Sequence, residues 1–424
     1  MGRFMIPTLL AAALSVQAVL GVDLVKCDKD NHCPEESPCC SQYGECGTGA
    51  YCLGGCDPIN SFELESCVPA PVCESKTYTW DDLDSVQKNT EYLGDASKAD
   101  WVSSGEALNS DGNLILTMAS GSVGTLLANN HYVWYGKTSA RMKTSRGNGV
   151  ITAFILLSDV KDEIDYEWVG ADLLTTQTNY YYQGILDWEN GENATVTDTF
   201  EEWHTYEIDW QPETLTWSID GEVKRTVNKA DTFNPETNQF EFPQSPARVQ
   251  LSLWPAGLPE NPKGTIEWAG GLVDWEHEDI KENGYYFATV DEVTIECYDP
   301  PANARIEGDV SYIFDNARAT NDTVIISDKP TVLKSFEATG TDMEAGDPEG
   351  SSTPSSDGDT TVPGQHGGGS GTQAGSDEDS GYSPAEPTTT GFSQNDNGAP
   401  AQGEHVLRGS LFAVLVAVVV LVTM

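Results

Sequence analysis

The sequence predicts an all-β protein, an antiparallel β-sandwich preceded by a small disulfide-rich module. Between residues 71 and 300 the chain consists of short runs rich in Val, Ile, Thr, Tyr and Trp, such as NLILTMA, VITAFILLS and RVQLSLW. No long segment there shows the periodicity of an amphipathic helix. In TLTWSI-DG-EVKRTV, Asp220-Gly221 separates two strand-like runs, which is a strong hairpin signal. Two packed antiparallel sheets, in a sandwich or jelly roll, account for this pattern.

Both ends of the 424-residue chain resemble processing signals. Residues 1–21 place a basic residue before a short apolar run and end on small residues, as in a cleaved signal peptide. Residues 401–424 end in SLFAVLVAVVVLVTM, and small residues upstream predict a glycolipid (GPI) anchor attached at Asn397. An ordinary tail anchor is the alternative, although so short a stretch spans a bilayer poorly. We therefore expect a secreted protein, anchored to the plasma membrane, the cell wall or both.

Two segments before the C-terminal signal differ from the β-rich region. Residues 346–400 are a mixture of Ser, Thr, Gly, Pro and Asp, which cannot bury enough apolar surface to offset chain entropy. They predict a disordered stalk with a composition typical of O-glycosylation. Residues 301–345 form an extension whose fold the sequence leaves uncertain. The N-x-T sequons at Asn193 and Asn321 predict N-glycosylation.

The charge of the chain bears on its partners. The formal net charge is −45, with 22 basic against 67 acidic residues. Nucleic-acid binding needs clustered Lys and Arg, so this balance excludes nucleic acid as a partner. A neutral extracellular partner is compatible with it.

Ten cysteines in a chain predicted to be secreted imply disulfides, and the even count allows five bridges. Residues 22–70 are cysteine-dense and poor in aliphatics, so bridges must replace a core there. Cys73 and Cys297 flank the β domain, and a bridge between them would tie its first and last strands. Spacing alone does not determine connectivity. With the cysteines in bridges, no His or Cys cluster has zinc spacing, and we predict neither metal nor cofactor.

The segment CC-SQYGE-C-GTGAY-C, from residue 39 to residue 52, resembles the core of hevein-like chitin-binding modules. That resemblance implies that Ser41, Tyr43 and Tyr51 hold N-acetylglucosamine, with the rings against the sugar faces. Glu45 stands where many members of that family have a further aromatic ring. The alternative is therefore a disulfide-held spacer that does not bind sugar.

The stretch DEIDYEWVG places Glu163, Asp165 and Glu167 at alternate positions between apolar and aromatic residues. On a strand these acids share one face, so we expect them to line the open concave side of the sandwich while their neighbours enter the core. Glycoside cleavage needs two carboxyl groups that flank the bond. Close like charges also keep one carboxyl protonated near neutral pH, as an acid catalyst requires. An edge strand with solvated acids and a calcium site are the alternatives.

In this context DEIDYE resembles the catalytic strand D-E-x-D-x-E of glycoside hydrolase family 16, the laminarinase-like jelly rolls. WYGKTSARMK, TTQTNYY and EEWHTYEIDW resemble the fungal Crh subgroup, wall enzymes that join chitin to glucan, over most of residues 76–300. The hevein-like module and the GPI signal match the layout of its Utr2-like members. The resemblance implies that Glu163 is the nucleophile, Glu167 the general acid/base and Asp165 an assisting residue.

The resemblance also implies a retaining transglycosylation, with chitin as donor and β-glucan as acceptor. Sugar rings present C–H faces to aromatic side chains and hydroxyls to amides. The predicted substrate-binding residues are Trp134, Tyr135, Gln177, Asn179, Tyr180, Trp254 and Trp268. His204 is expected to be a hydrogen-bonded core or surface group. The alternatives are a chitin or β-glucan hydrolase of the same fold and a non-catalytic chitin-binding wall protein.

Overall fold

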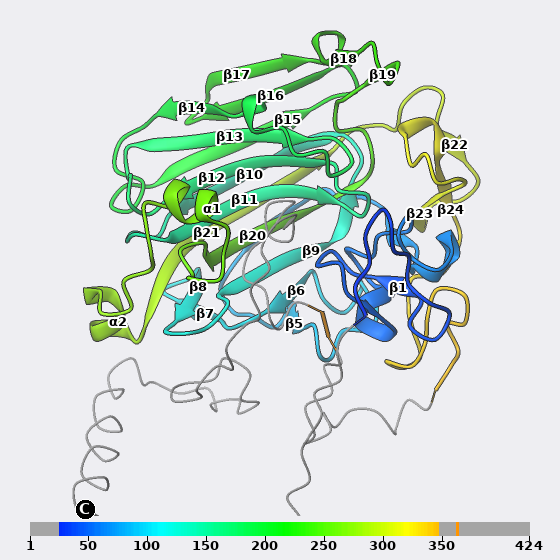
Figure 1. The fold of residues 1–424 in the computed structure, drawn as a ribbon, viewed down its shortest axis with the longest axis horizontal. Helices are drawn as coiled ribbons and strands as arrows, with labels where there is room; N and C mark the ends of the chain where they lie inside the picture. Colours follow the sequence, from blue (N-terminus) through cyan, green and yellow to red (C-terminus); the bar gives the residue numbers. More distant parts are fainter. Residues whose placement is uncertain (1–24, 347–361, 364–424) are drawn as a thin grey trace, which may run out of the picture.

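The structure, a computed structural model, describes residues 25–346 and 362–363 (Figure 1). The predicted signal peptide, the GPI signal with Asn397, and all of the predicted stalk except Gly346 and residues 362–363 lie outside the described residues. Within the described part, no helix is both long enough and apolar enough to cross a membrane.

Two eight-stranded sheets form the body of the molecule and confirm the predicted antiparallel sandwich (Figure 1). The sheet that contains the acidic strand β12 is called the carboxylate sheet, and its order is β14-β13-β12-β11-β20-β9-β6-β5. Its strands are β5 (Val86–Lys88), β6 (Trp101–Ser104), β9 (Thr125–Val133), β11 (Val150–Ser158), β12 (Glu163–Val169), β13 (Thr175–Tyr181), β14 (Glu192–Thr195) and β20 (Ala247–Pro255). All neighbours in it are antiparallel except β5 and β6.

The second sheet, called the supporting sheet, has the order β17-β16-β15-β10-β21-β8-β7, with β4 also paired to β21. Its strands are β4 (Lys76–Thr79), β7 (Ala107–Ser110), β8 (Asn113–Ala119), β10 (Gly136–Lys143), β15 (His204–Trp210), β16 (Thr214–Ile219), β17 (Glu222–Asn228) and β21 (Tyr285–Cys297). Short helices occur in the loops: α1 (Lys263–Trp268), α2 (Glu278–Asn283), η3 (Trp188–Asn190) and η4 (Lys229–Thr232). A two-stranded pair, β18 (Phe233–Asn234) and β19 (Gln239–Phe240), lies in a loop as well.

Aromatic side chains fill the space between the two sheets. From β12, Ile164, Tyr166 and Trp168 enter this core, as the alternation predicted. The ring of Trp168 packs edge-on against Tyr206 of β15, with ring centroids 4.5 Å apart. Because successive residues of a strand face opposite ways, these three anchors turn the intervening acids to the other face of the sheet.

The hairpin predicted at Asp220-Gly221 joins β16 to β17. Both turn residues have positive φ, 53° and 79°, as a tight two-residue hairpin turn requires. The side chain of Asp220 lies 2.7 Å from Nδ1 of His204, whose Nε2 lies 3.1 Å from the hydroxyl of Thr197. His204 is thus a buried, hydrogen-bonded group, as expected.

Five disulfides account for all ten cysteines. The pairs are Cys27–Cys40, Cys33–Cys46, Cys39–Cys52, Cys56–Cys67 and Cys73–Cys297. The Cys73–Cys297 bridge, which spacing alone left open, thus joins the two ends of the β domain. Among the described residues, the sole group of three His, Cys, Asp or Glu with ligand atoms within 4.8 Å is Cys27, Cys33 and Cys40, whose sulfurs are in bridges and cannot act as thiolate ligands.

The module between residues 25 and 70 has few regular elements, namely β1 (Cys39–Cys40), β2 (Cys46–Gly47), η1 (Gly49–Cys52), η2 (Leu64–Ser66) and the start of β3 (Ala70–Pro71). The extension after residue 300 is folded and contains β22 (Arg305–Ile306), β23 (Ser311–Phe314), η5 (Asn321–Thr323) and β24 (Val324–Ser327). These strands and β3 form one four-stranded sheet. Farther on, the hydroxyl of Thr48 donates to the carbonyl of Phe336 (3.0 Å), and the Gly49 N–H donates to that of Ala338 (2.9 Å). The extension thus packs against the module.

Removing the Cys73–Cys297 bridge tests how much this disulfide stabilises the protein by restricting the unfolded chain. Cys73→Ser/Cys297→Ser opens a link across 224 residues, whereas Cys56→Ser/Cys67→Ser opens one across 11. Loop-closure entropy predicts losses of about 5 and about 3 kcal/mol respectively in the free energy of unfolding. Guanidinium denaturation followed by tryptophan fluorescence measures both variants. Equal losses would contradict an entropic role for the longer bridge.

Candidate active site

The three acids of β12 lie side by side on the face of the carboxylate sheet that turns away from the core. The side chains of Glu163, Asp165 and Glu167 are almost fully buried, with exposed fractions of 3%, 1% and 6%. The residues directly opposite them on β11 are apolar: Leu157, Ile155 and Ala153. The residues opposite them on β13 are polar or aromatic: Tyr181, Asn179 and Gln177. Each acid therefore lies between an apolar residue of β11 and a polar or aromatic residue of β13.

This burial excludes the alternatives of solvated acids and of an edge strand. Strand β12 pairs on both sides, and all of its residues are buried. A calcium ion needs six to eight oxygen ligands, whereas one side of the acidic row is hydrocarbon. The acids lie on the predicted face, but they are almost fully buried there.

Burial and mutual repulsion set the protonation of these carboxyl groups. Burial, and then the charge of Glu163, raise the pKa of Glu167 to about 8. Burial, and then the charges of Glu163 and Glu167, raise the pKa of Asp165 well above its usual range. No N–H or hydroxyl of a described residue donates to the Asp165 oxygens, and the group that faces them is the Glu163 carboxyl. Two carboxyls can hydrogen-bond only through a proton, so we infer that Asp165 is protonated and donates to Glu163.

The start of β12 is fixed by Asp162, the residue before Glu163. Its buried carboxylate accepts hydrogen bonds from the backbone N–H groups of Gln183 (2.9 Å), Gln244 (2.9 Å) and Ser245 (3.0 Å), and from the Ser245 hydroxyl (2.6 Å). These bonds connect two loops to the strand. Burial, as the largest effect, raises the pKa of Asp162 to about 6.

A cavity of about 530 Å³ opens beside Glu167. Its walls come from β13, β14, η3, α1 and their loops, with the side chains of Gln177, Asn179, Trp188, Glu192, Asn193, Thr265 and Trp268. Three of the predicted substrate-binding residues, Gln177, Asn179 and Trp268, therefore lie together next to Glu167. The indole N–H of Trp268 donates to the side-chain oxygen of Gln177 at 2.8 Å, which fixes both groups at the wall.

The other four predicted residues do not line this cavity. The structure places Trp134, Tyr135 and Tyr180 in the core between the sheets. Trp134 donates to the backbone carbonyl of Gln244 (3.0 Å), and Tyr180 points to the face opposite Asn179. Trp254 is buried behind Trp268, with ring centroids 6.3 Å apart. These side chains pack in the hydrophobic core, a role for which Trp and Tyr are as well suited as they are for stacking on a sugar ring.

Trp188 and Asn193 are among the cavity residues that were not predicted as substrate contacts. Trp188 is 59% exposed and stands edge-on to Tyr181, with ring centroids 6.1 Å apart. A lone Trp in the polar stretch LDWENGEN was the signal that could have identified it. Asn193, predicted as a glycosylation site, lies directly opposite Gln177 and on the same wall. The other sequon residue, Asn321, is half-buried, with its side-chain nitrogen 3.5 Å from the Tyr135 hydroxyl.

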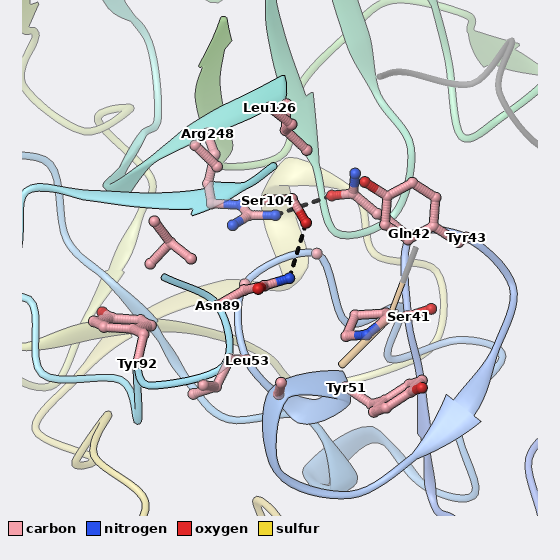
Figure 2. A pocket seen from close by; sticks show the side chains of 16 residues that line it. Ser41, Gln42, Tyr43, Tyr51, Leu53, Asn89, Tyr92, Ser104, Leu126 and Arg248 are labelled. Atoms are coloured by element: carbon pink, nitrogen blue, oxygen red, sulfur yellow. Dashed lines mark hydrogen bonds between the residues drawn. The ribbon is translucent and has the colours of Figure 1, made fainter. Parts of the chain in front are cut away.

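The predicted sugar contacts of the module gather around a second, smaller cavity that faces the carboxylate sheet (Figure 2). Ser41 and Tyr51 are buried, with exposed fractions of 2% and 4%, and Tyr43 is half-buried. Glu45, which stands where relatives have an aromatic ring, is also buried and forms an ion pair with Lys26 at 3.0 Å. The structure thus brings Ser41, Tyr43 and Tyr51 together, but on an inward-facing side of the module.

Known proteins share this sequence and architecture. Residues 95–270 match Glycosyl hydrolases family 16. Crh-like protein 2 of Aspergillus fumigatus is 55% identical over 439 aligned residues, which cover 98% of this chain and 99% of that protein. The chain belongs to the Crh-like family.

Other Crh-like proteins support this assignment. Crh-like protein UTR2 of Candida albicans is 44% identical and covers 81% of this chain and 75% of its own length. A solved structure described as Crh5 transglycosylase in complex with NAG is 32% identical, with a TM-score of 0.51, and covers 63% of this chain and 98% of that one. The Crh-like chain described here is thus a glycoside hydrolase or transglycosylase.

The raised pKa of Glu167 predicts how stability depends on pH. A carboxyl whose folded-state pKa is raised stabilises the fold fully below its unfolded pKa of 4.5, and this contribution is lost as pH rises through about 8. Glu167→Gln cannot ionise, so it should match the wild type near pH 4.5 and exceed its free energy of unfolding at pH 9 by a few kcal/mol. Urea denaturation at both pH values measures the difference. The exposed Glu236→Gln should give no such pH-dependent gain, and an equal gain there would contradict the assignment.

Proposed function

We propose that this chain is a cell-wall transglycosylase that cleaves chitin by a retaining double displacement and transfers the fragment to a β-glucan. The observation that carries the proposal is the row of three buried carboxyls on β12, where burial and neighbouring charge raise the pKa of Glu167 to about 8 and that of Asp165 well above its usual range. This is the arrangement of one nucleophile and one proton donor that a glycosidase needs. The similarity to a transglycosylase in complex with NAG supports the donor, since NAG is the repeating unit of chitin.

In the first step the carboxylate of Glu163 attacks the anomeric carbon of the donor. Glu167 transfers its proton to the glycosidic oxygen as the bond to the leaving chain breaks. Its pKa of about 8 keeps this proton in place at the pH of most extracellular media. The hydrogen bond from Asp165 holds the Glu163 carboxylate in position and shares its charge.

The second step reverses the role of Glu167. Burial remains the larger cause of the raised pKa of Glu167, but once Glu163 is an ester its negative charge is gone, and the repulsion that added to the effect of burial is removed. Glu167 then accepts the proton of the incoming acceptor hydroxyl, whose oxygen forms the new bond to the anomeric carbon as the bond to Glu163 breaks. Two inversions retain the anomeric configuration.

The cavity beside Glu167 supports transfer to a sugar acceptor. Glu167 protonates the leaving oxygen, so the space next to it receives first the leaving chain and then the acceptor. The walls offer aromatic faces from Trp188 and Trp268 and amides from Gln177 and Asn193. A carbohydrate that fills about 530 Å³ displaces water from the neighbourhood of the glycosyl-enzyme bond. Retention of the acceptor therefore favours transfer over hydrolysis.

The remaining parts of the chain are assigned by the same proposal. The module binds chitin through Ser41, Tyr43 and Tyr51 and directs the enzyme to its polymer. Residues 1–21 direct secretion, and residues 401–424 are exchanged for a GPI anchor at Asn397, which leaves the enzyme at the membrane and cell wall. Asn193 and Asn321 are the predicted glycan acceptors.

The nucleophile is tested with Glu163→Gln in the full chain. Chitin oligosaccharides and a fluorescent β-1,3-glucan are supplied together, and products are identified by mass. We expect hybrid chains with the wild type and a loss of at least about 10³-fold in their rate with Glu163→Gln, because no covalent intermediate can form. Glu236→Gln is the matched control and should keep full rate. Hybrid formation by Glu163→Gln would contradict the assignment, and shortened chitin without hybrids would indicate a hydrolase.

The acceptor cavity is tested with Trp188→Ala. Loss of one aromatic platform should raise the KM for the glucan acceptor about 2- to 10-fold and increase the share of hydrolysed product, with chitin cleavage nearly unchanged. Trp203→Ala removes an indole on the supporting sheet, where it contacts Arg141 and Lys143, and should alter neither quantity. An unchanged acceptor KM in Trp188→Ala would exclude this cavity as the acceptor site.

A further inference from the structure

The segment Val362–Pro363 lies at the predicted sugar-binding residues of the module. Pro363 lines the same cavity as Ser41, Tyr43 and Tyr51. The hydroxyl of Tyr51 donates a hydrogen bond to the backbone carbonyl of Val362 at 3.2 Å. Val362 itself is 3% exposed. Two residues far along the chain are thus fitted into the site that resembles a chitin-binding site.

The sequence around Val362 distinguishes this pair of residues from the rest of the polar stretch between residues 346 and 400. Between residues 346 and 400, Val362 is the sole Val, Ile, Leu or Met, and a proline follows it directly. An isolated Val-Pro pair in a polar stretch is suited to an aromatic-lined groove, because proline has a fixed backbone and loses little entropy on binding. The rings of Tyr43, Tyr51 and Tyr92 line this groove (Figure 2).

The groove is closed from behind by the carboxylate sheet. Arg248 and Gln250 of β20 donate hydrogen bonds to the side-chain oxygen of Gln42, at 3.1 and 3.3 Å. The Gly55 N–H donates to the carboxylate of Asp159 at 2.9 Å. These contacts dock the module on the sheet and leave a cavity of only about 70 Å³ at the site. Ligand pockets are typically about 300–1,000 Å³, so no sugar ring fits beside Val362–Pro363.

We propose that Val362–Pro363 is a tethered occupant of the module's sugar site and that a chitin chain must displace it to bind. The inference rests on the proposed chitin binding by Ser41, Tyr43 and Tyr51. The proline ring offers C–H groups to an aromatic face, as a pyranose does, and the Val362 carbonyl accepts the Tyr51 hydroxyl in place of a sugar oxygen. The module therefore binds chitin only when Val362–Pro363 has left the sugar site.

The fraction of molecules in which Val362–Pro363 fills the sugar site determines how much the affinity of the module for chitin is reduced. A segment held on the same chain acts at an effective concentration in the millimolar range, so a weak contact is enough to fill the site. The apparent affinity for sugar falls by the fraction of molecules whose site is empty. We expect the intact segment to weaken chitin-oligosaccharide binding at the module about 10-fold.

The test compares Val362→Ser/Pro363→Gly with Thr353→Ser/Pro354→Gly, both in the full chain carrying Glu163→Gln so that the sugar is not turned over. Hydrogen exchange by mass spectrometry is measured on residues 41–52, first without sugar and then with increasing chitotriose. Because only peptides of the module are followed, sugar binding there is distinguished from sugar binding at the active site. The proposal predicts faster exchange around Tyr51 without sugar in the Val362/Pro363 variant, and protection by chitotriose at about 10-fold lower concentration. The control should behave as the parent chain.

Three other results would overturn the proposal, and each has a different meaning. Unchanged exchange without sugar would show that the segment does not occupy the site. Faster exchange with unchanged sugar affinity would show that segment and sugar do not compete, while chitin binding by the module stands. Faster exchange with no protection by chitotriose in any variant would show that the module does not bind chitin, and the proposed competition would fail with that part of the proposed function.

Discussion

The rest of the structure depends on the burial of three like-charged groups on one strand face. Three carboxyl groups on alternate residues of one strand cannot all ionise easily when they are buried, so burial and mutual repulsion raise the pKa of Glu167 to about 8 and that of Asp165 well above its usual range. Apolar residues of β11 lie opposite the acids on one side, and Tyr181, Asn179 and Gln177 of β13 lie opposite them on the other. Protonation state is thus a consequence of strand register. A slip of one residue would exchange the acids with the aromatic anchors and destroy both core and site.

The surroundings of β12 keep this unfavourable arrangement in place. On the core side, the indole N–H of Trp217 donates to the backbone carbonyl of Asp165 at 3.0 Å, and the Tyr166 hydroxyl donates to that of Ser218 at 2.9 Å. At the start of the strand, Asp162 accepts four hydrogen bonds from two loops. The strand is therefore fixed through its backbone and its aromatic side.

The sequence was informative where a periodic pattern had one physical explanation. Alternation along DEIDYEW determined which residues enter the core, and the Asp220-Gly221 turn determined a hairpin. Residue type alone was ambiguous for Trp134 and Tyr180, because aromatic side chains serve equally in a core and on a sugar platform. Contacts between segments that are distant in the chain could not be predicted from the sequence of either segment. The pairing of β23 with β3 and the position of Val362 beside Tyr51 both depend on the folded chain.

The bridge between Cys73 and Cys297 has a mechanical meaning. The chain enters the sandwich through β4 and leaves it through β21, and these two strands are paired neighbours in the supporting sheet. A pull applied between the module and the extension reaches both ends of the sandwich at this covalent link. Once the direct contacts between the module and the extension are broken, the load passes through the sulfur–sulfur bond and bypasses the two eight-stranded sheets. Strand β12 can therefore keep its register while tension on the ends of the protein rises and falls.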